Sequence, residues 1–285
     1  MREKEFNTKN IAEDDNLRSE YIRNLFQVIS EQSNVTAKTY IPKIIMQFWH
    51  EKDNIPNDVQ ECIDTWKITE EQGFNRLLFD DKSAREYILK EFGSKYVKAF
   101  DKCHHPAMRC DFFRLCFIYN VGGFYIDIDE VYQGENLAQL LNDNNLKIQP
   151  LCYEISSDSM IDPSIFLNTE SPSEDWIFYV NNNPIISPPK HPLIKSALDR
   201  ATKLLLKTDS KNLEIQSTTG PGNLSASLVM HSLNCEKRNV QFDYSIIPEW
   251  NKISEIKWFL SYRNDNRNWR IWNAERERDN LQFNK

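Results

Sequence analysis

The sequence predicts an α/β fold in which helices flank a central, mostly parallel sheet. Two apolar runs, residues 44–49 and 75–79, have the length of buried strands. Each is followed by a segment with helical periodicity, residues 57–68 and 82–92. The order strand, helix, strand, helix is typical of a parallel sheet. Because ligands bind beyond the carboxyl ends of such strands, we expect a site at that edge of the sheet.

Composition indicates a globular chain with a sizeable core. The 285 residues are 40% hydrophobic, and no apolar run approaches the ~18 residues of a membrane span. A formal net charge of −7 disfavours non-specific binding to nucleic acid or to anionic membranes. Residues 1–15 lack the apolar core of a signal peptide, which favours the cytoplasm and six reduced, buried cysteines. The cysteines and histidines of residues 103–110 lack the CxxC or HxxxH spacing of a zinc site.

A helical extension is predicted to precede the main domain. Apolar residues recur at helical spacings over residues 16–30, which indicates an amphipathic helix. We assign residues 1–37 to this N-terminal helical extension and residues 38–285 to the main domain. The helix is expected to pack against the main domain, and peripheral contact with a membrane surface or an acceptor is the alternative.

Residues 108–119 are a strongly apolar helical segment that nonetheless carries Asp111 and Arg114. A helix of this kind is buried around most of its circumference. Buried charges are costly unless they are paired or face a polar cavity. Because Asp111 and Arg114 are three residues apart, they share one helix face, and we expect that face to form a wall of the site.

An acidic sequence follows a glycine pair. Gly122 and Gly123 permit a tight change of direction, and residues 124–126 have the character of a strand start. Side chains alternate along a strand, so Asp127 and Asp129 are expected on one side of it. Neighbouring carboxylates repel each other unless a positive charge lies between them, and Mg²⁺ and Mn²⁺ prefer such oxygen ligands. The sequence therefore predicts a divalent-metal site, and the alternative is a pair of solvated aspartates at a strand end.

The stretch 104–132 resembles the DXD-motif sugar-nucleotide glycosyltransferases. It is similar to the initiating α-1,6-mannosyltransferases and the capsular-polysaccharide sugar transferases, and more distantly to the catalytic domains of clostridial glucosylating toxins. The family pattern is Asp, two apolar residues, Arg, an apolar helix, Gly-Gly, an aromatic residue and Asp-x-Asp. The matching residues are Asp111, Arg114, Gly122, Gly123, Tyr125, Asp127 and Asp129.

This resemblance implies a GT-A fold and a metal-dependent reaction. A sugar would pass from a UDP- or GDP-sugar to an acceptor hydroxyl with retention of anomeric configuration. The resemblance implies that Asp129 binds Mn²⁺ or Mg²⁺ and that Asp127 binds the metal or the donor ribose. It further implies that Asp111 and Arg114 hold the sugar hydroxyls, with Tyr125 beside the donor. The predicted catalytic residues are Asp111, Arg114, Asp127 and Asp129. The resemblance implies that no carboxylate nucleophile is needed.

The implied acceptor is a surface glycan such as capsular polysaccharide or lipopolysaccharide. One alternative is a secreted effector that glycosylates a host protein. Another is a non-catalytic nucleotide-binding protein in which the two aspartates merely cap a strand.

Two further segments match the family. Trp49 ends a strand like the one that opens the family's domain, and by resemblance it would stack on the nucleotide base, although Met46 replaces the family's His. Towards its C-terminus the family carries a His and a Ser-Trp pair near the metal, and this chain has no His there. Asn268 and Trp269 are the nearest equivalents, so both are predicted to contact the donor and Asn268 to bind the metal, with Asn266 as the alternative ligand.

Several other polar groups have more than one predicted role. Asp80 and Asp81 are expected to contact the donor ribose or base, with a helix N-cap role for Asp81 as the alternative. The Thr-Gly-Pro sequence at 219–221 shapes the acceptor side or caps a helix, and His191 is expected to be structural near a helix start. The Asn-rich residues 181–184 are expected to form a loop.

Overall fold

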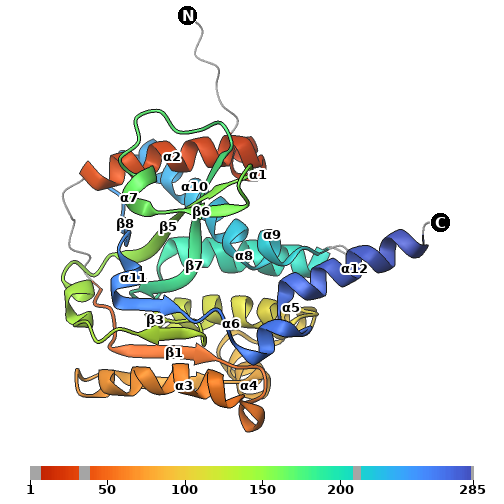
Figure 1. Ribbon diagram of the computed structural model, residues 1–285. Coiled ribbons are helices and arrows are strands. Elements are labelled where there is room, and N and C mark those ends of the chain that lie inside the picture. Colours follow the sequence, from red (N-terminus) through yellow and green to blue (C-terminus); the bar gives the residue numbers. More distant parts are fainter. Residues whose placement is uncertain (1–7, 32–38, 208–212, 284–285) are drawn as a thin grey trace, which may run out of the picture.

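The computed structural model describes residues 8–31, 39–207 and 213–283. A seven-stranded sheet runs through the molecule, and helices pack on it (Figure 1). The strand order is β2-β1-β3-β7-β5-β6, with β8 beside β5. The strands are β1 (Ile44–Phe48), β2 (Asn75–Phe79), β3 (Gly123–Tyr125), β5 (Leu146–Glu154), β6 (Ser159–Ile161), β7 (Trp176–Ser187) and β8 (Tyr244–Ile246). A separate two-stranded sheet joins β4 (Glu130–Tyr132) to β9 (Ser254–Ile256).

Most strands of the main sheet point in one direction. β1 runs parallel to β2 and to β3, and β8 runs parallel to β5. β7 is antiparallel to both β3 and β5, so β5 has the same direction as β3, and β6 is antiparallel to β5. Only β6 and β7 therefore oppose the others among the described strands of this sheet. The predicted α/β fold with a mostly parallel sheet is confirmed.

Helices α3 and α4 follow β1 and β2, and their bounds are close to the predicted ranges 57–68 and 82–92. The α-helices are α1 (Thr8–Glu13), α2 (Asp15–Glu31), α3 (Asn57–Thr65), α4 (Asp81–Phe92), α5 (Ser94–Phe100), α6 (Pro106–Val121), α7 (Pro163–Phe166), α8 (Pro192–Lys207), α9 (Ile215–Thr218), α10 (Pro221–Arg238), α11 (Trp250–Ile253) and α12 (Trp269–Phe283). The 3-10 helices are η1 (Lys52–Asn54), η2 (Trp66–Glu70), η3 (Leu137–Leu141) and η5 (Ser261–Asn264). No helix in the described parts of the chain combines the length and the apolar character needed to cross a membrane.

Alternating side chains divide the core between the two faces of the sheet. On one face, Met46 and Tyr125 join a large core that includes buried residues of α2, α4, α6, α8 and α10. On the other face, Ile45 and Phe124 pack in a smaller cluster around Trp66. The apolar helix α6 therefore lies on the large-core face, against the strands whose ends form the site.

The glycine pair fixes how α6 enters β3. Gly122 has φ 76° and Gly123 has φ 98°, a backbone conformation that favours glycine. A Cβ atom on Gly122 would lie 2.7 Å from the backbone oxygen of Ser187, and one on Gly123 would lie 2.7 Å from that of Ile44. No larger residue fits this turn, which holds α6 close to the sheet.

Helix α2 packs on the main core. Its apolar face buries Ile22, Leu25 and Phe26, and the ring centre of Phe26 lies 6.2 Å from that of Phe166. The helix predicted over residues 16–30 is confirmed. The predicted boundary between residues 37 and 38 lies outside the described residues, so the division into an extension and a main domain stays a prediction.

Candidate active site

A pocket of about 400 Å³ opens beyond the carboxyl ends of β1 and β3. Its wall includes residues of β1, α6 and β3, of the turn after β3 and of the start of α12. The wall contains the predicted site residues Trp49, Asp111, Arg114, Tyr125, Asp127, Asp129, Asn268 and Trp269. The structure thus brings these residues together, and their individual roles stay predictions.

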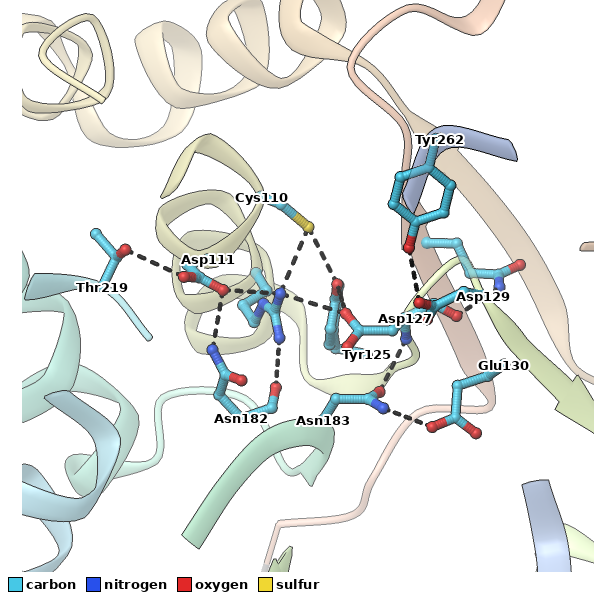
Figure 2. A network of polar contacts seen from close by, with 12 residues as sticks. Cys110, Asp111, Tyr125, Asp127, Asp129, Glu130, Asn182, Asn183, Thr219 and Tyr262 are labelled. Atoms are coloured by element: carbon cyan, nitrogen blue, oxygen red, sulfur yellow. Dashed lines mark hydrogen bonds and ion pairs between the residues drawn. The ribbon is translucent and has the colours of Figure 1, made fainter. Parts of the chain in front are cut away.

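Asp111 and Arg114 form a buried ion pair on α6. Nη2 of Arg114 lies 2.8 Å from Oδ1 of Asp111, and the two side chains are 5% and 8% exposed, respectively. Figure 2 shows Asp111 between Asn182 and Thr219, which donate hydrogen bonds of 2.9 and 3.1 Å to its carboxylate. The predicted sharing of one helix face is confirmed, and the Thr-Gly-Pro sequence contributes directly to this network.

Burial and pairing act in opposite directions on Asp111. Burial raises the pKa of its carboxyl group, whereas Arg114 and the two hydrogen bonds lower it. Arg114 is itself held from several sides: Nη1 donates to the backbone oxygen of Asn182 at 2.6 Å, and the guanidinium lies 3.9 Å from the ring centre of Tyr125. The guanidinium therefore connects α6 with β7 and β3.

Asp127 and Asp129 lie in a turn between two sheets, which corrects their predicted place on one strand. β3 ends at Tyr125 and β4 begins at Glu130. Because β4 pairs with β9 and not with the main sheet, the chain has to leave the main sheet after Tyr125. The alternation rule therefore does not apply to the two aspartates, although both still line the pocket.

Asp127 is held through one carboxylate oxygen. Its Oδ1 accepts a hydrogen bond from the Tyr125 hydroxyl and lies 3.3 Å from Nη2 of Arg114. Burial raises the pKa of Asp127 to about 6, with Arg114 opposing the shift and Asp129 adding to it. Within the described residues, no hydrogen bond or ion pair engages Oδ2, and the side chain is 35% exposed.

Asp129 is held in the same one-sided way. Its Oδ2 accepts a hydrogen bond of 2.7 Å from the Tyr262 hydroxyl and forms an ion pair with Arg263. Oδ1 has no hydrogen bond or ion pair in the described parts of the chain. Figure 2 shows Tyr262 above Asp129, with its hydroxyl directed at the carboxylate. Oδ2 of Asp127 and Oδ1 of Asp129 are therefore the carboxylate oxygens available to a ligand.

Glu130 is a buried acid that the sequence analysis missed. It is 1% exposed, and its Oε1 accepts a hydrogen bond of 2.7 Å from Asn183 (Figure 2). The side-chain oxygen of Asn183 in turn accepts a hydrogen bond of 2.8 Å from the backbone N–H of Asp127. Burial raises the pKa of Glu130 to about 7, and Asp127 and Asp129 add to the shift. Asn183 thus links the backbone of Asp127 to the carboxylate of Glu130.

We expect the Glu130→Gln protein to gain stability relative to the parent as pH rises from about 5 to 8. Glu ionises near pH 4.5 when unfolded but near pH 7 in the fold, so the folded state binds an extra proton between these values. The contribution of Glu130 to stability therefore falls as pH rises through this window, by about 3 kcal/mol above it, and neutral Gln avoids that loss.

Urea unfolding at about pH 5 and pH 8 without divalent cations measures this effect. The variant should resemble the parent at the lower pH and be more stable at the higher pH. If the difference in free energy of unfolding between the variant and the parent were the same at both pH values, the prediction would be contradicted.

Trp49 belongs to both the core and the pocket wall. It is 5% exposed, and its ring meets that of Tyr262 edge-on, with ring centres 5.3 Å apart. Its Nε1 donates to the backbone oxygen of Asn54 at 3.3 Å. These contacts fix the indole at the end of β1, and base stacking stays its predicted role.

Asn268 caps the last helix. Its Oδ1 accepts a hydrogen bond of 3.1 Å from the N–H of Arg270, and its Nδ2 donates to the backbone oxygen of Arg263 at 2.8 Å. The alternative ligand, Asn266, accepts a hydrogen bond of 2.9 Å from His105 through its backbone oxygen. The side-chain oxygen of Asn268 accepts one hydrogen bond and has a second lone pair, and metal binding by this residue stays a prediction.

The remaining polar candidates have structural contacts. Asp80 caps α4 by accepting from the N–H of Ser83 at 2.8 Å, and Asp81 pairs with Arg109 at 2.8 Å. The predicted N-cap role of Asp81 is therefore wrong, because α4 begins at Asp81 and Asp80 is its N-cap residue. His105 accepts a hydrogen bond from the N–H of Ala107 at the start of α6.

Residues 56–149 match the family described as "Glycosyltransferase sugar-binding region containing DXD motif". The matched range contains α6, β3 and the turn with Asp127 and Asp129. This segment is similar to a DXD glycosyltransferase region. The predicted resemblance is confirmed, and the turn, which we call the DXD motif, carries the Asp-x-Asp pattern within the matched range.

The chain is also similar to individual known proteins, among them one relative and one solved structure. "Uncharacterized glycosyltransferase L373" of Acanthamoeba polyphaga mimivirus is 30% identical over 106 residues, which are 35% of this chain. The aligned part spans 40% of the length of that relative. The solved structure "PaToxG Glycosyltransferase" matches with a TM-score of 0.46 and 17% sequence identity, covering 81% of this chain and 84% of that one.

Proposed function

We propose that the protein is a metal-dependent, retaining glycosyltransferase that moves a sugar from a UDP- or GDP-sugar to an acceptor hydroxyl. The observation that carries this proposal is the pocket itself. The buried Asp111–Arg114 pair and both aspartates of the DXD motif open into one cavity of about 400 Å³. Charged and aromatic side chains that converge in this way suit a donor with a sugar, a diphosphate and a base.

The carboxylate oxygens fit Mn²⁺ or Mg²⁺. The partner-free Oδ2 of Asp127 and Oδ1 of Asp129 would hold the ion, and such ions take one or two carboxylates together with substrate phosphates. Among the described residues, Asp111 and Asp127 share Arg114 as an ion-pair partner, and Asp129 pairs with Arg263. When bound, the ion would supply neutralisation of the charge on the departing diphosphate.

Asp111 and Arg114 would hold the sugar hydroxyls. Both line the pocket, and Nε of Arg114 is buried without a hydrogen-bond partner in the described structure. A buried donor without a partner is costly, and a hydroxyl oxygen would satisfy it. Because the pair is held by Asn182 and Thr219, its geometry is set before the donor arrives.

We expect Trp49→Ala to weaken binding of a nucleoside diphosphate by roughly 5- to 150-fold. Stacking of a base on an aromatic ring contributes about 1 to 3 kcal/mol, and Ala removes it. Trp49→Phe keeps a ring and should retain much of the affinity. Calorimetric titration of both variants measures the effect, with circular dichroism as the control for folding. Unchanged affinity in a folded Ala variant would place Trp49 in the core alone.

Donor hydrolysis tests the proposal as a whole. The purified chain is incubated with Mn²⁺ and a panel of UDP- and GDP-sugars, and release of nucleoside diphosphate is followed. We expect slow hydrolysis of one donor that stops with EDTA and returns with Mn²⁺. Nucleotide binding without any hydrolysis would favour a non-catalytic nucleotide-binding protein instead.

We further propose a surface glycan as the acceptor, by the resemblance to polysaccharide sugar transferases. A secreted effector that modifies a host protein is the alternative. A labelled donor distinguishes the two, because the label passes to a polysaccharide fraction in the first case and to a protein band in the second.

A further inference from the structure

A second polar cluster lies outside the pocket that contains Asp127 and Asp129, which we call the DXD pocket. It lies between α10, α8 and the start of β8. Its members are His231 and Cys235 of α10 and Asp243 before β8, and one ligand atom from each lies within 4.8 Å of the other two. None of the three lines the DXD pocket. They instead line a separate pocket of about 310 Å³.

The hydrogen-bond geometry excludes a Cys-His-Asp catalytic triad. Such a triad places the carboxylate at one ring nitrogen and the nucleophile at the other. Here Nε2 of His231 lies 2.6 Å from Oδ1 of Asp243 and also 3.8 Å from Sγ of Cys235. A single nitrogen cannot relay a proton between these two groups. The three ligand atoms converge on one point instead.

This convergence is close to the dimensions of a tetrahedral metal site. Zn²⁺ binds sulfur at about 2.3 Å and nitrogen or oxygen at about 2.0 to 2.2 Å, so tetrahedral ligands are separated by about 3.3 to 3.6 Å. The observed Nε2–Oδ1 and Nε2–Sγ separations are 2.6 and 3.8 Å, and all three atoms lie within 4.8 Å of one another, so binding an ion would take only small shifts of these side chains. His231 and Cys235 are four residues apart on one helix, which puts both on the same face. A thiolate with an imidazole selects Zn²⁺ over the oxygen-preferring Mg²⁺ and Mn²⁺.

A second histidine orients the carboxylate. Nδ1 of His191 accepts a hydrogen bond of 3.2 Å from the N–H of Leu193, so Nε2 carries the proton. That Nε2 lies 3.2 Å from the backbone oxygen of Asp243 and 3.4 Å from its Oδ2. The other carboxylate oxygen of Asp243, Oδ1, therefore faces His231. Partners that hold a ligand in this way are typical of metal sites.

We propose that His231, Cys235 and Asp243 bind one Zn²⁺, which would clamp α10 to the segment that leads into β8. The thiolate and the carboxylate would balance the charge of the ion. Three protein ligands leave the fourth position open towards the 310 Å³ pocket, where a water molecule would complete the tetrahedron.

Cobalt titration of the full chain tests this site without measuring activity. Co²⁺ replaces Zn²⁺ and reports a thiolate ligand through a charge-transfer absorption in the near ultraviolet. We expect one equivalent of Co²⁺ to produce that absorption, and Zn²⁺ to abolish it and to raise the melting temperature. Cys235→Ser should lose the absorption. Cys152→Ser, which changes a buried cysteine of β5 outside the cluster, should keep it, and so should Asp129→Asn in the DXD motif.

A milder variant keeps the test decisive if Cys235→Ser does not fold. His191→Asn retains a side chain that caps helices well but loses the donor to Asp243. Loss of such a supporting contact costs about 10- to 100-fold in metal affinity. Absence of the absorption in the parent chain, its persistence in folded Cys235→Ser, or unchanged affinity in His191→Asn would overturn the proposal.

Discussion

An Arg114→Met protein is expected to lose about 3 to 5 kcal/mol of its free energy of unfolding. The substitution leaves Asp111 buried without its cation, and burial already disfavours that carboxylate. It also removes the 2.6 Å hydrogen bond to the backbone of Asn182 and the contact with the Tyr125 ring. Urea unfolding followed by circular dichroism measures the loss.

Two controls separate this effect from a general cost of removing arginine. In Asp111→Asn/Arg114→Met both charges are absent, so the double variant should regain part of the stability lost in Arg114→Met. Arg85→Met breaks an ion pair with Asp101 whose side chains are 50% and 44% exposed, and little change is expected there. An Arg114→Met protein as stable as Arg85→Met would show that the buried pair does not hold α6 in place.

The helix α6 and its ion pair are predictable because the information is local. Asp111 and Arg114 lie three residues apart, and the helical repeat alone places them on one face. The apolar runs that become β1 and β2 are also local, and their observed bounds lie within one residue of those predicted. Parallel pairing of these strands then brings Trp49 and the DXD motif to one edge of the sheet.

The partners of the charged residues are not predictable in the same way, because they come from distant segments. Asn182 and Thr219 reach Asp111 across 71 and 108 positions of the chain, and Arg263 reaches Asp129 across 134. No sequence periodicity connects such positions. The segment 181–184, expected as a loop, lies inside β7, and there it presents Asn182 and Asn183 to the site.

The turn with the two aspartates shows how a long-range pairing overrides a local rule. Strand alternation predicts one strand through Asp127 and Asp129, but the pairing of β4 with β9 draws the chain out of the main sheet. The sequence of the turn carries no sign of β9, which is formed more than 120 residues later. The same pairing brings Glu130 behind the motif, and its place as a third acid directly after the two aspartates was its only local signal.

An Asp129→Asn protein is expected to fold normally and to lose metal-dependent donor binding. The amide oxygen of Asn can still accept hydrogen bonds from Tyr262 and Arg263, so the turn keeps its contacts. The substitution removes one negative charge from the group that would hold the ion, and a carboxylate is the ligand that Mn²⁺ and Mg²⁺ prefer. Asp127→Asn should be milder if Asp127 contacts the ribose. Asp101→Asn, on an exposed ion pair, is the matched control.

Calorimetric titration of UDP and GDP with and without Mn²⁺ is the most direct measurement of this role. In the parent chain and in Asp101→Asn, Mn²⁺ should tighten binding of one nucleotide at least tenfold, or about 1.4 kcal/mol. In Asp129→Asn that gain should vanish, together with Mn²⁺-dependent hydrolysis of the donor. Full Mn²⁺-dependent binding and turnover in Asp129→Asn would contradict the assignment of the DXD motif as the metal site.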